Sequence, residues 1–258
     1  MKTKLLLLVF LIKNIIGFAQ TTYVPDNNFE NYLETHDAIG NVVAIGDVNS
    51  MGNGIANDNY ITTANINTVT ILNVDNNNIV DLTGIEDFPN LIELWCRYNQ
   101  IKSLDISNNT TLTRFSCAYN QINNLDLSNN INLIELGCHR NYLSTLDVSA
   151  NIALIQISCG ANQLSGLDIS ANKNLALLYC NSNQLNSLDV SNNALLYKIW
   201  CYDNKLNSLD VSNNIALIYL LCNDNQLSSI DISANTNLAL LYCNSNQINS
   251  LDVSNNVL

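Results

Sequence analysis

Eight cysteines recur along the sequence at a constant spacing of 21 residues, and an asparagine follows each of them three positions later. Thiols in such a series could form disulfides, bind a metal or pack as small apolar groups. Metal sites usually pair their ligands, as in Cys-x-x-Cys, whereas this chain has Cys-x-x-Asn throughout. We therefore expect no metal site at the cysteines, which are Cys96, Cys117, Cys138, Cys159, Cys180, Cys201, Cys222 and Cys243.

The elements that hold these cysteines are units of an internal repeat. Residues 91–258 divide into eight 21-residue units without insertion or deletion, and a 22-residue unit, 69–90, precedes them. Each unit contains a Leu-x-x-Leu-x-Cys-x-x-Asn half and a second half of nearly the same spacing, with an aliphatic residue in place of Cys. Alternating apolar residues indicate a short strand, and one unit cannot bury its apolar face alone. The pattern predicts a repeat solenoid of about nine coils with short parallel β-strands.

The stacking distance between coils decides what the cysteines do. Equivalent residues in neighbouring parallel strands lie about 4.8 Å apart and point the same way, whereas a disulfide needs Cβ atoms about 3.8 Å apart with converging bonds. The alternative, four disulfides in a secreted chain, fits the even number of cysteines. We favour a column of buried free thiols. By the same stacking, we expect the repeated asparagines to form buried columns whose hydrogen bonds are all satisfied.

An aspartate recurs in the second half of every 21-residue unit, within Leu-Asp-Val-Ser and its variants. Carboxylates one coil apart repel one another, so the column is either a calcium ladder or a solvated row in which each Asp bonds nearby backbone or Ser groups. We favour the solvated row. Its members are Asp105, Asp126, Asp147, Asp168, Asp189, Asp210, Asp231 and Asp252.

These motifs resemble the leucine-rich-repeat family, whose signature is Leu-x-x-Leu-x-Leu-x-x-Asn-x-Leu. The resemblance covers residues 69–258 and recurs in nine units. The nested half-repeat with Leu-Asp-Val-Ser-x-Asn is similar to a bacterial subclass found in secreted surface proteins of Bacteroidetes type, and the architecture resembles that of internalins. The resemblance implies recognition of a protein or a glycan rather than catalysis.

The first 68 residues lie outside the repeat. Residues 1–19 have the features of a signal peptide: Lys2 and Lys4 precede a short apolar stretch, and the small residue Ala19 precedes the expected cleavage point. The alternative is an apolar N-terminal strand. The stretch is too short to span a membrane. We expect residues 20–68 to form an N-terminal cap, with a helix starting near Asp26 and burying Phe29, Tyr32 and Leu33.

Residues 47–58 partly match a calcium-binding loop. Asp47, Asn49, Gly52 and Asp58 occupy suitable positions, but Met51 replaces a ligand and a short Asp stands where a bidentate Glu is usual. We favour a Gly/Asn-rich surface loop. At the other end no capping segment follows the last repeat, so we expect either a fragment of a longer protein or an end that something else protects.

The outward positions beside each cysteine vary between repeats, whereas the Leu-Asp-Val-Ser halves change little. By strand alternation the variable positions share one sheet face. Charged residues concentrate in the first coils and aromatic residues in the later ones, most of all between Tyr179 and Tyr242. The alternative is that bulky residues simply suit strands. Exposed aromatic and basic residues favour a contact site, so the candidate ligand-binding residues are Trp95, Arg97, Arg114, Tyr179, Lys198, Trp200, Tyr202, Tyr219, Leu221 and Tyr242.

Composition and motifs exclude several functions. The net charge is −12 with only 10 Lys and Arg, which are not clustered, so nucleic acid is not an expected partner. The two histidines, His36 and His139, lie in different regions, and no catalytic or cofactor-binding motif appears. We expect no enzyme activity and no cofactor. The prediction is a secreted or cell-surface binding or adhesion module for a protein or glycan, compatible with a monomer; the alternative is a structural spacer without a ligand.

Overall fold

The computed structural model describes residues 20–256. The expected signal peptide, 1–19, lies outside the described residues. No helix among those described is long and apolar enough to cross a membrane.

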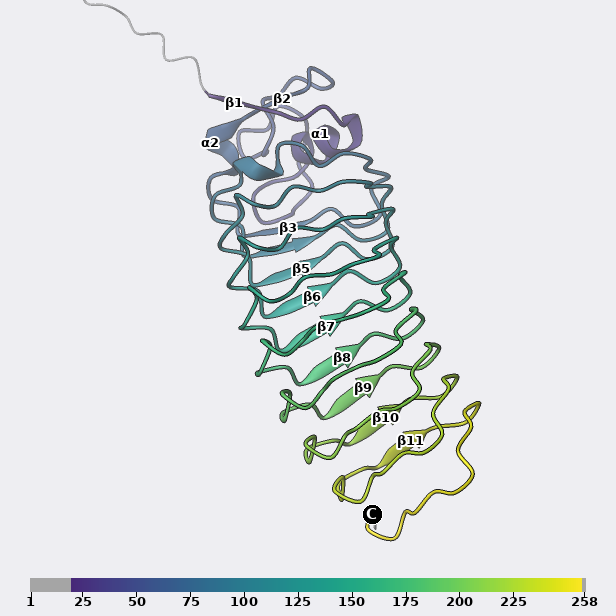
Figure 1. Ribbon diagram of the computed structural model, residues 1–258. Helices are drawn as coiled ribbons and strands as arrows, with labels where there is room; N and C mark the ends of the chain where they lie inside the picture. The colour runs from purple at the N-terminus through teal and green to yellow at the C-terminus, as the bar shows by residue number, and fades with distance from the viewer. Residues whose placement is uncertain (1–19, 257–258) are drawn as a thin grey trace, which may run out of the picture.

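Nine three-residue strands form one parallel sheet that runs the length of the molecule, as the repeat predicts (Figure 1). Each residue pairs with its equivalent one repeat later, for example Leu94 with Phe115 and Trp95 with Ser116. The central residue of each strand points inward, because alternation sends its two neighbours to the opposite face. The strands are β3 (Ile71–Asn73), β4 (Glu93–Trp95), β5 (Arg114–Ser116), β6 (Glu135–Gly137), β7 (Gln156–Ser158), β8 (Leu177–Tyr179), β9 (Lys198–Trp200), β10 (Tyr219–Leu221) and β11 (Leu240–Tyr242).

The cysteines lie directly after these strands and form a column in the core. All eight are free; seven are buried and Cys243 is half-buried. Burial raises the pKa of the Cys159 thiol to about 12, and burial likewise raises the pKa of Cys138. The thiols therefore stay protonated and occupy slots equivalent to those of leucine, as the stacking geometry predicts.

Two columns of asparagine flank the core, and they are bonded differently. Asn141, from a cysteine half, accepts the Ile122 N–H at 2.9 Å and donates to the carbonyls of Cys117 and Cys138. Asn151, from a Leu-Asp-Val-Ser half, donates to two carbonyls, but its Oδ1 accepts no hydrogen bond from a described protein group. The expectation that both columns are fully bonded is wrong for the second, because no backbone N–H of the neighbouring coil is aimed at its carbonyl oxygen.

The N-terminal cap covers the first coil with a two-stranded antiparallel sheet and short helices. Strand β1 (Thr21–Tyr23) pairs with β2 (Tyr60–Thr62). Helix α1 (Asn27–Glu34) begins where the Asp26 carboxylate accepts the N–H groups of Asn28 and Phe29, and it buries Phe29, Tyr32 and Leu33, as predicted. Helix α2 (Thr63–Ile66) also belongs to this region, whereas the 3-10 helix η1 (Ile85–Asp87) lies in the first repeat unit.

Two buried acids of α1 organise the loop that resembles a calcium site. Glu34 accepts the N–H groups of Asn53 and Gly54, and Glu30 accepts those of Asp58 and Asn59. A Cβ on Gly52 would collide with the Glu34 carboxylate, so glycine allows this close approach. Residues 47–58 are thus a loop held by carboxylates that bind its backbone.

Candidate ligand-binding groove on the sheet face

A run of small residues hollows the outward face of the sheet. In the column just before Cys, Trp95 is followed by Ser116, Gly137 and Ser158, and the next residue is Tyr179. A Cβ on Gly137 would lie 2.7 Å from the Ser116 Oγ, so glycine at this position leaves room for the Ser116 side chain. The small residues leave a trough between two tall aromatic walls.

The trough consists of two adjoining depressions, of about 140 and about 550 Å³, which share His139, Gln156 and Ser158. We call them together the sheet-face groove. The floor comprises Ser116, Gly137, Gln156, Ser158, Gly160 and Ala161; the first wall comprises Trp95, Arg97, Tyr119, His139 and Arg140; the second wall comprises Tyr179, Trp200 and Tyr202.

Stacked rings build the first wall. Tyr98 and Tyr119 stack with centroids 4.2 Å apart, and Tyr119 meets His139 edge-on at 5.2 Å. The Arg140 guanidinium lies 5.2 Å from the centre of the Tyr119 ring. Burial, helped by the positive charges of Arg140 and Arg97, lowers the pKa of His139, so this imidazole is neutral at pH 7.

Tyr98, Tyr119 and Arg140 share a left-handed backbone, with φ of 56°, 56° and 55°. This turn position costs an ordinary residue about 1–2 kcal/mol and suits Asn, Asp or Gly better. The other 21-residue units place Ala, Ser or Asp there. Tyr98 and Tyr119 are not among the candidates predicted from the sequence, which came from the two outward strand positions and the position just after Cys. The available signal was a tyrosine at the turn position of two successive units.

The second wall contains the aromatic residues that the sequence singled out. Tyr179 meets Trp200 edge-on, with centroids 4.8 Å apart and an interplanar angle of 82°. Lys198 lies over the rings of both Trp200 and Tyr219, at 5.6 and 4.8 Å. The buried Trp200 Nε1–H donates no hydrogen bond to a described protein group. Leu221 and Tyr242 lie on the same sheet beyond this wall and do not line the groove.

The basic candidates differ in whether a carboxylate already holds them. Arg97 pairs with Asp75 at 2.6 Å, and Arg114 pairs with Glu93 at 2.8 Å and Glu135 at 3.4 Å. Arg140 and Lys198 form no ion pair with any residue between 20 and 256. The groove thus has one unpaired cation on its rim at Arg140 and a second at Lys198, beside the second wall.

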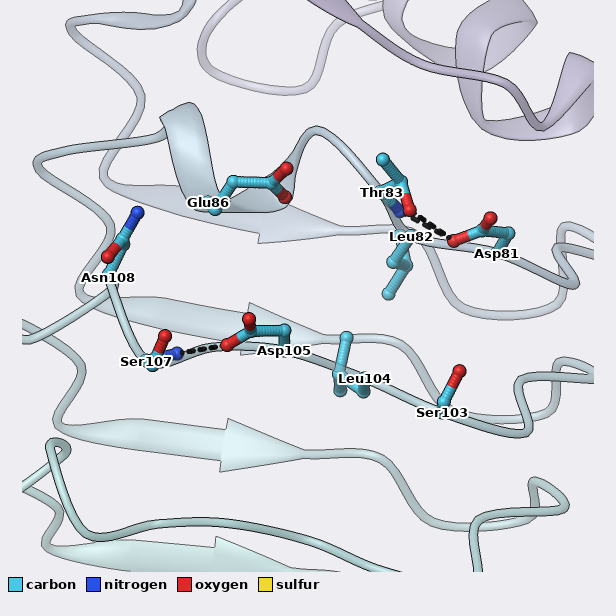
Figure 2. Close-up of a pocket in the computed structure, with 9 residues that line it drawn as sticks. All are labelled: Asp81, Leu82, Thr83, Glu86, Ser103, Leu104, Asp105, Ser107 and Asn108. Carbon is cyan, nitrogen blue, oxygen red and sulfur yellow. Dashed lines mark hydrogen bonds between the residues drawn. The ribbon is translucent and has the colours of Figure 1, made fainter.

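A separate depression of about 450 Å³ lies on the return segments of the first coils (Figure 2). Its carboxylates are occupied by local groups: Asp81 accepts from Thr83 at 2.8 Å, Asp105 accepts the Ser107 N–H at 2.9 Å, and Glu86 accepts the Gly84 N–H. Within the described residues, no three metal-binding side chains cluster.

The later aspartates of the column repeat this arrangement. Asp210, for example, accepts the Ser212 N–H at 2.9 Å, and hydrogen bonds from Ser212 lower the pKa of its carboxyl. These contacts agree with the solvated row.

Comparison with known proteins supports the repeat family. No family model matches the chain. Internalin J of Listeria monocytogenes serotype 4b (strain F2365) is 32% identical over 116 residues, which are 37% of this chain and 13% of that protein. The solved functional domain of InlJ from Listeria monocytogenes, described as including a cysteine ladder, is 31% identical with a TM-score of 0.70, over 92% of this chain and 55% of that one.

Internalin C2 of Listeria monocytogenes str. 4b F2365 shares the fold, with a TM-score of 0.74 and 22% identity over 87% of this chain and 98% of that one. This chain spans about an eighth of internalin J and about half of the solved InlJ domain. The 21-residue pattern and the parallel sheet, with the fold shared by these structures, make the chain a leucine-rich-repeat solenoid, and its sequence is similar to that of internalin J.

Proposed function

We propose that the chain is a secreted or cell-surface recognition module that binds a ligand, a protein or a glycan, in the sheet-face groove. The observation that carries the proposal is the groove itself: a floor of small residues between two walls of aromatic and basic side chains, on the one face whose residues vary between repeats. Tyr, Trp and Arg are the residues that most often dominate interfaces. The likeness to internalins favours a protein ligand.

Recognition accounts for the residues of the groove better than catalysis does. His139 is the groove's only histidine, and no carboxylate except Glu135 lines it. Glu135 already lies 3.4 Å from Arg114. Acid–base chemistry needs titratable groups held in distinct environments beside one another, and the lining supplies no such pair. The proposed organisation is a signal peptide over 1–19, a cap over 20–68 and the recognition solenoid over 69–258.

The test is an unbiased array of extracellular proteins and glycans, probed with the secreted chain. The triple variant Tyr179→Ala, Trp200→Ala, Tyr202→Ala should lose the array signal, because truncating an aromatic hot spot at the centre of an interface costs about 2 kcal/mol or more. A matched control, Ile152→Ala, Leu195→Ala, Ile215→Ala, removes apolar side chains that are 61%, 56% and 63% exposed outside the strands. This control should retain the signal.

An array signal that survives the groove substitutions would contradict the proposal. If the wild-type chain gives no signal at all, the alternative function, a surface spacer without a ligand, is favoured.

A further inference from the structure

Arg140 is the feature of the groove that points to the chemistry of its ligand, and this inference rests on the proposed function. Its side chain is exposed, lies over the Tyr119 ring and has no carboxylate partner in the described chain. A guanidinium held against an aromatic ring keeps its planar hydrogen-bonding fork free for a carboxylate. Arg140 is therefore positioned to bind an anionic group from outside the molecule.

The surrounding charges favour an acidic ligand at this place. The described residues that line the larger depression include Arg140 and the neutral His139 but no Asp or Glu. Of the two arginines that line the groove, Arg97 is paired with Asp75, whereas Arg140 has no carboxylate partner among the described residues. Lys198 adds a second unpaired cation beside the second wall.

The backbone at Arg140 is a second, independent observation. Its left-handed conformation, with φ of 55°, is one that arginine adopts at a cost and that the later units fill with Ala, Ser or Asp. Apart from the contact with the Tyr119 ring, no ion pair or burial inside the described chain offsets this cost. A contact with a ligand would account for the arginine.

The second wall favours an apolar side chain over a sugar ring. Stacking of sugars requires an open, flat aromatic face, whereas Tyr179 and Trp200 meet at 82° and form a corner. The buried Trp200 Nε1–H, a donor without a partner in the described chain, can bind a backbone carbonyl that arrives beside that side chain.

The spacing of the two walls gives the spacing of the ligand groups. Along the axis of the solenoid, Arg140 and Trp200 belong to coils three apart, a rise of about 14 Å at about 4.8 Å per coil. An extended chain advances about 3.3 Å per residue, so about four residues span this distance. We infer that the sheet-face groove binds an extended acidic protein segment, with an Asp or Glu carboxylate on Arg140 and, about four residues away, an apolar side chain in the Tyr179–Trp200 corner.

A random dodecapeptide library displayed on phage tests this inference against the secreted chain. Selection on the wild type should enrich peptides with Asp or Glu about four residues from a large apolar residue. Arg140→Gln should abolish the enrichment of the acid, whereas Lys173→Gln, which removes the same charge at an exposed site outside the groove, should leave it intact. Arg140→Lys keeps the charge without the planar fork and should retain part of the preference.

A synthetic peptide from the enriched set then gives the magnitude. Replacing its acid by the matching amide should weaken binding to the wild type about tenfold and should change binding to Arg140→Gln by less than twofold. The inference is overturned if the library enriches neutral or basic peptides, if it enriches none, or if the acid preference persists in Arg140→Gln. It is also overturned if glycans are the only ligands found on the array. Any ligand that still binds and requires Trp200 leaves the proposed function standing.

Discussion

The two halves of each coil have the same apolar spacing but differ in what they keep constant. The strand half, Leu-x-x-Leu-x-Cys-x-x-Asn, keeps its inward residues and varies its outward ones; the return half, Leu-x-x-Leu-Asp-Val-Ser-x-Asn, varies little. In the strand half, the parallel ladder bonds the backbone of each coil to both neighbouring coils. The asparagine after each cysteine adds bonds to the preceding coil, as Asn141 does to Ile122 and Cys117. In the return half, where no strand forms, side chains do this work: Asn151 donates to the Leu127 and Asn130 carbonyls of the preceding coil, and the Asp147 carboxylate accepts the Ser149 N–H within its own turn.

This difference explains where recognition can develop in the molecule. Because the strand half is held through its backbone, its outward side chains can change without loss of the fold. The return half is held through Asp, Ser and Asn, so those residues are fixed. The groove residues can vary because backbone hydrogen bonds hold the strand half, and the aspartates stay constant because side-chain hydrogen bonds hold the return half.

The largest effect that we expect to distinguish the two halves is a loss of stability at alkaline pH, caused by the cysteines of the strand half. Burial raises thiol pKa values in the folded state, to about 12 for Cys159, whereas an unfolded thiol titrates near 9. Above the pKa of the unfolded thiols, the unfolded chain loses thiol protons that the folded chain keeps. The free energy of unfolding therefore falls as the pH rises. Each thiol contributes about 1.4 kcal/mol per pH unit, and with seven buried thiols the slope is about 10 kcal/mol per pH unit.

Urea unfolding measured between about pH 8 and pH 10.5 checks this slope. The double variant Cys138→Ala, Cys180→Ala should reduce it by about 3 kcal/mol per pH unit. Val148→Ala, in the buried return-half slot, should lower stability and leave the slope unchanged. A stability that is constant from about pH 9 to pH 10 would show that the thiols are not buried in this way.

The two asparagine columns provide the next contrast. Asn141→Ala leaves the buried Ile122 N–H unpaired and removes one of the two amide donors to each of the Cys117 and Cys138 carbonyls, at a cost of about 4 kcal/mol. Asn151→Ala removes two hydrogen bonds, to the Leu127 and Asn130 carbonyls that also accept a backbone N–H, and it leaves no group unpaired, so we expect a cost of about 2 kcal/mol. Chemical denaturation of the two variants gives the order directly. Equal costs, or a larger cost at Asn151, would mean that the columns are equivalent after all.

Filling the groove should separate binding from folding. Ser158→Tyr extends the outward column of Tyr179 and Trp200 across the floor, at a strand position that tolerates bulky residues. We expect the unfolding free energy to change by less than about 0.5 kcal/mol and ligand affinity to fall at least about tenfold. Calorimetry with an array-derived ligand measures the second quantity. Unchanged affinity would place the ligand elsewhere.

The smallest expected effect comes from the left-handed turn position. Ala161 has a φ of 53° and no polar side chain that would offset the strain. Ala161→Gly should stabilise the chain by about 0.5 kcal/mol, because the strain relieved slightly exceeds the added entropy of the unfolded chain. A higher urea midpoint is the expected observation, and a lower one would show that this turn carries no strain.

Much of the fold could be predicted from the sequence because the repeat has a constant period. Local spacing fixes which residues point inward, so the strands, the cysteine column and the helix starting at Asp26 follow from it. The bonding of Asn151 does not follow, because it depends on where a neighbouring coil aims its N–H groups. Nor does the burial of Glu30 and Glu34, whose partners are backbone groups about twenty or more residues away.

The candidate site was only partly visible in the sequence. The aromatic column containing Tyr179 and Trp200 was evident from the comparison of repeats. The groove itself arises where small residues in three successive coils lie side by side. Its first wall depends on the left-handed turn position, which holds Tyr98, Tyr119 and Arg140 in the first 21-residue units and Ala, Ser or Asp in the later ones. The ion pair that occupies Arg97 likewise depends on Asp75 in the preceding unit.

The sequence contains two tryptophans, Trp95 and Trp200, and they lie at opposite ends of the groove. Acrylamide quenching of their fluorescence, measured with and without an array-derived ligand, therefore tests the central claim without any label. The account predicts that saturating ligand lowers the quenching constant, and that the protection persists in Trp95→Phe, where Trp200 alone reports. A ligand that binds at saturation and leaves the quenching of both tryptophans unchanged would contradict recognition through the sheet-face groove.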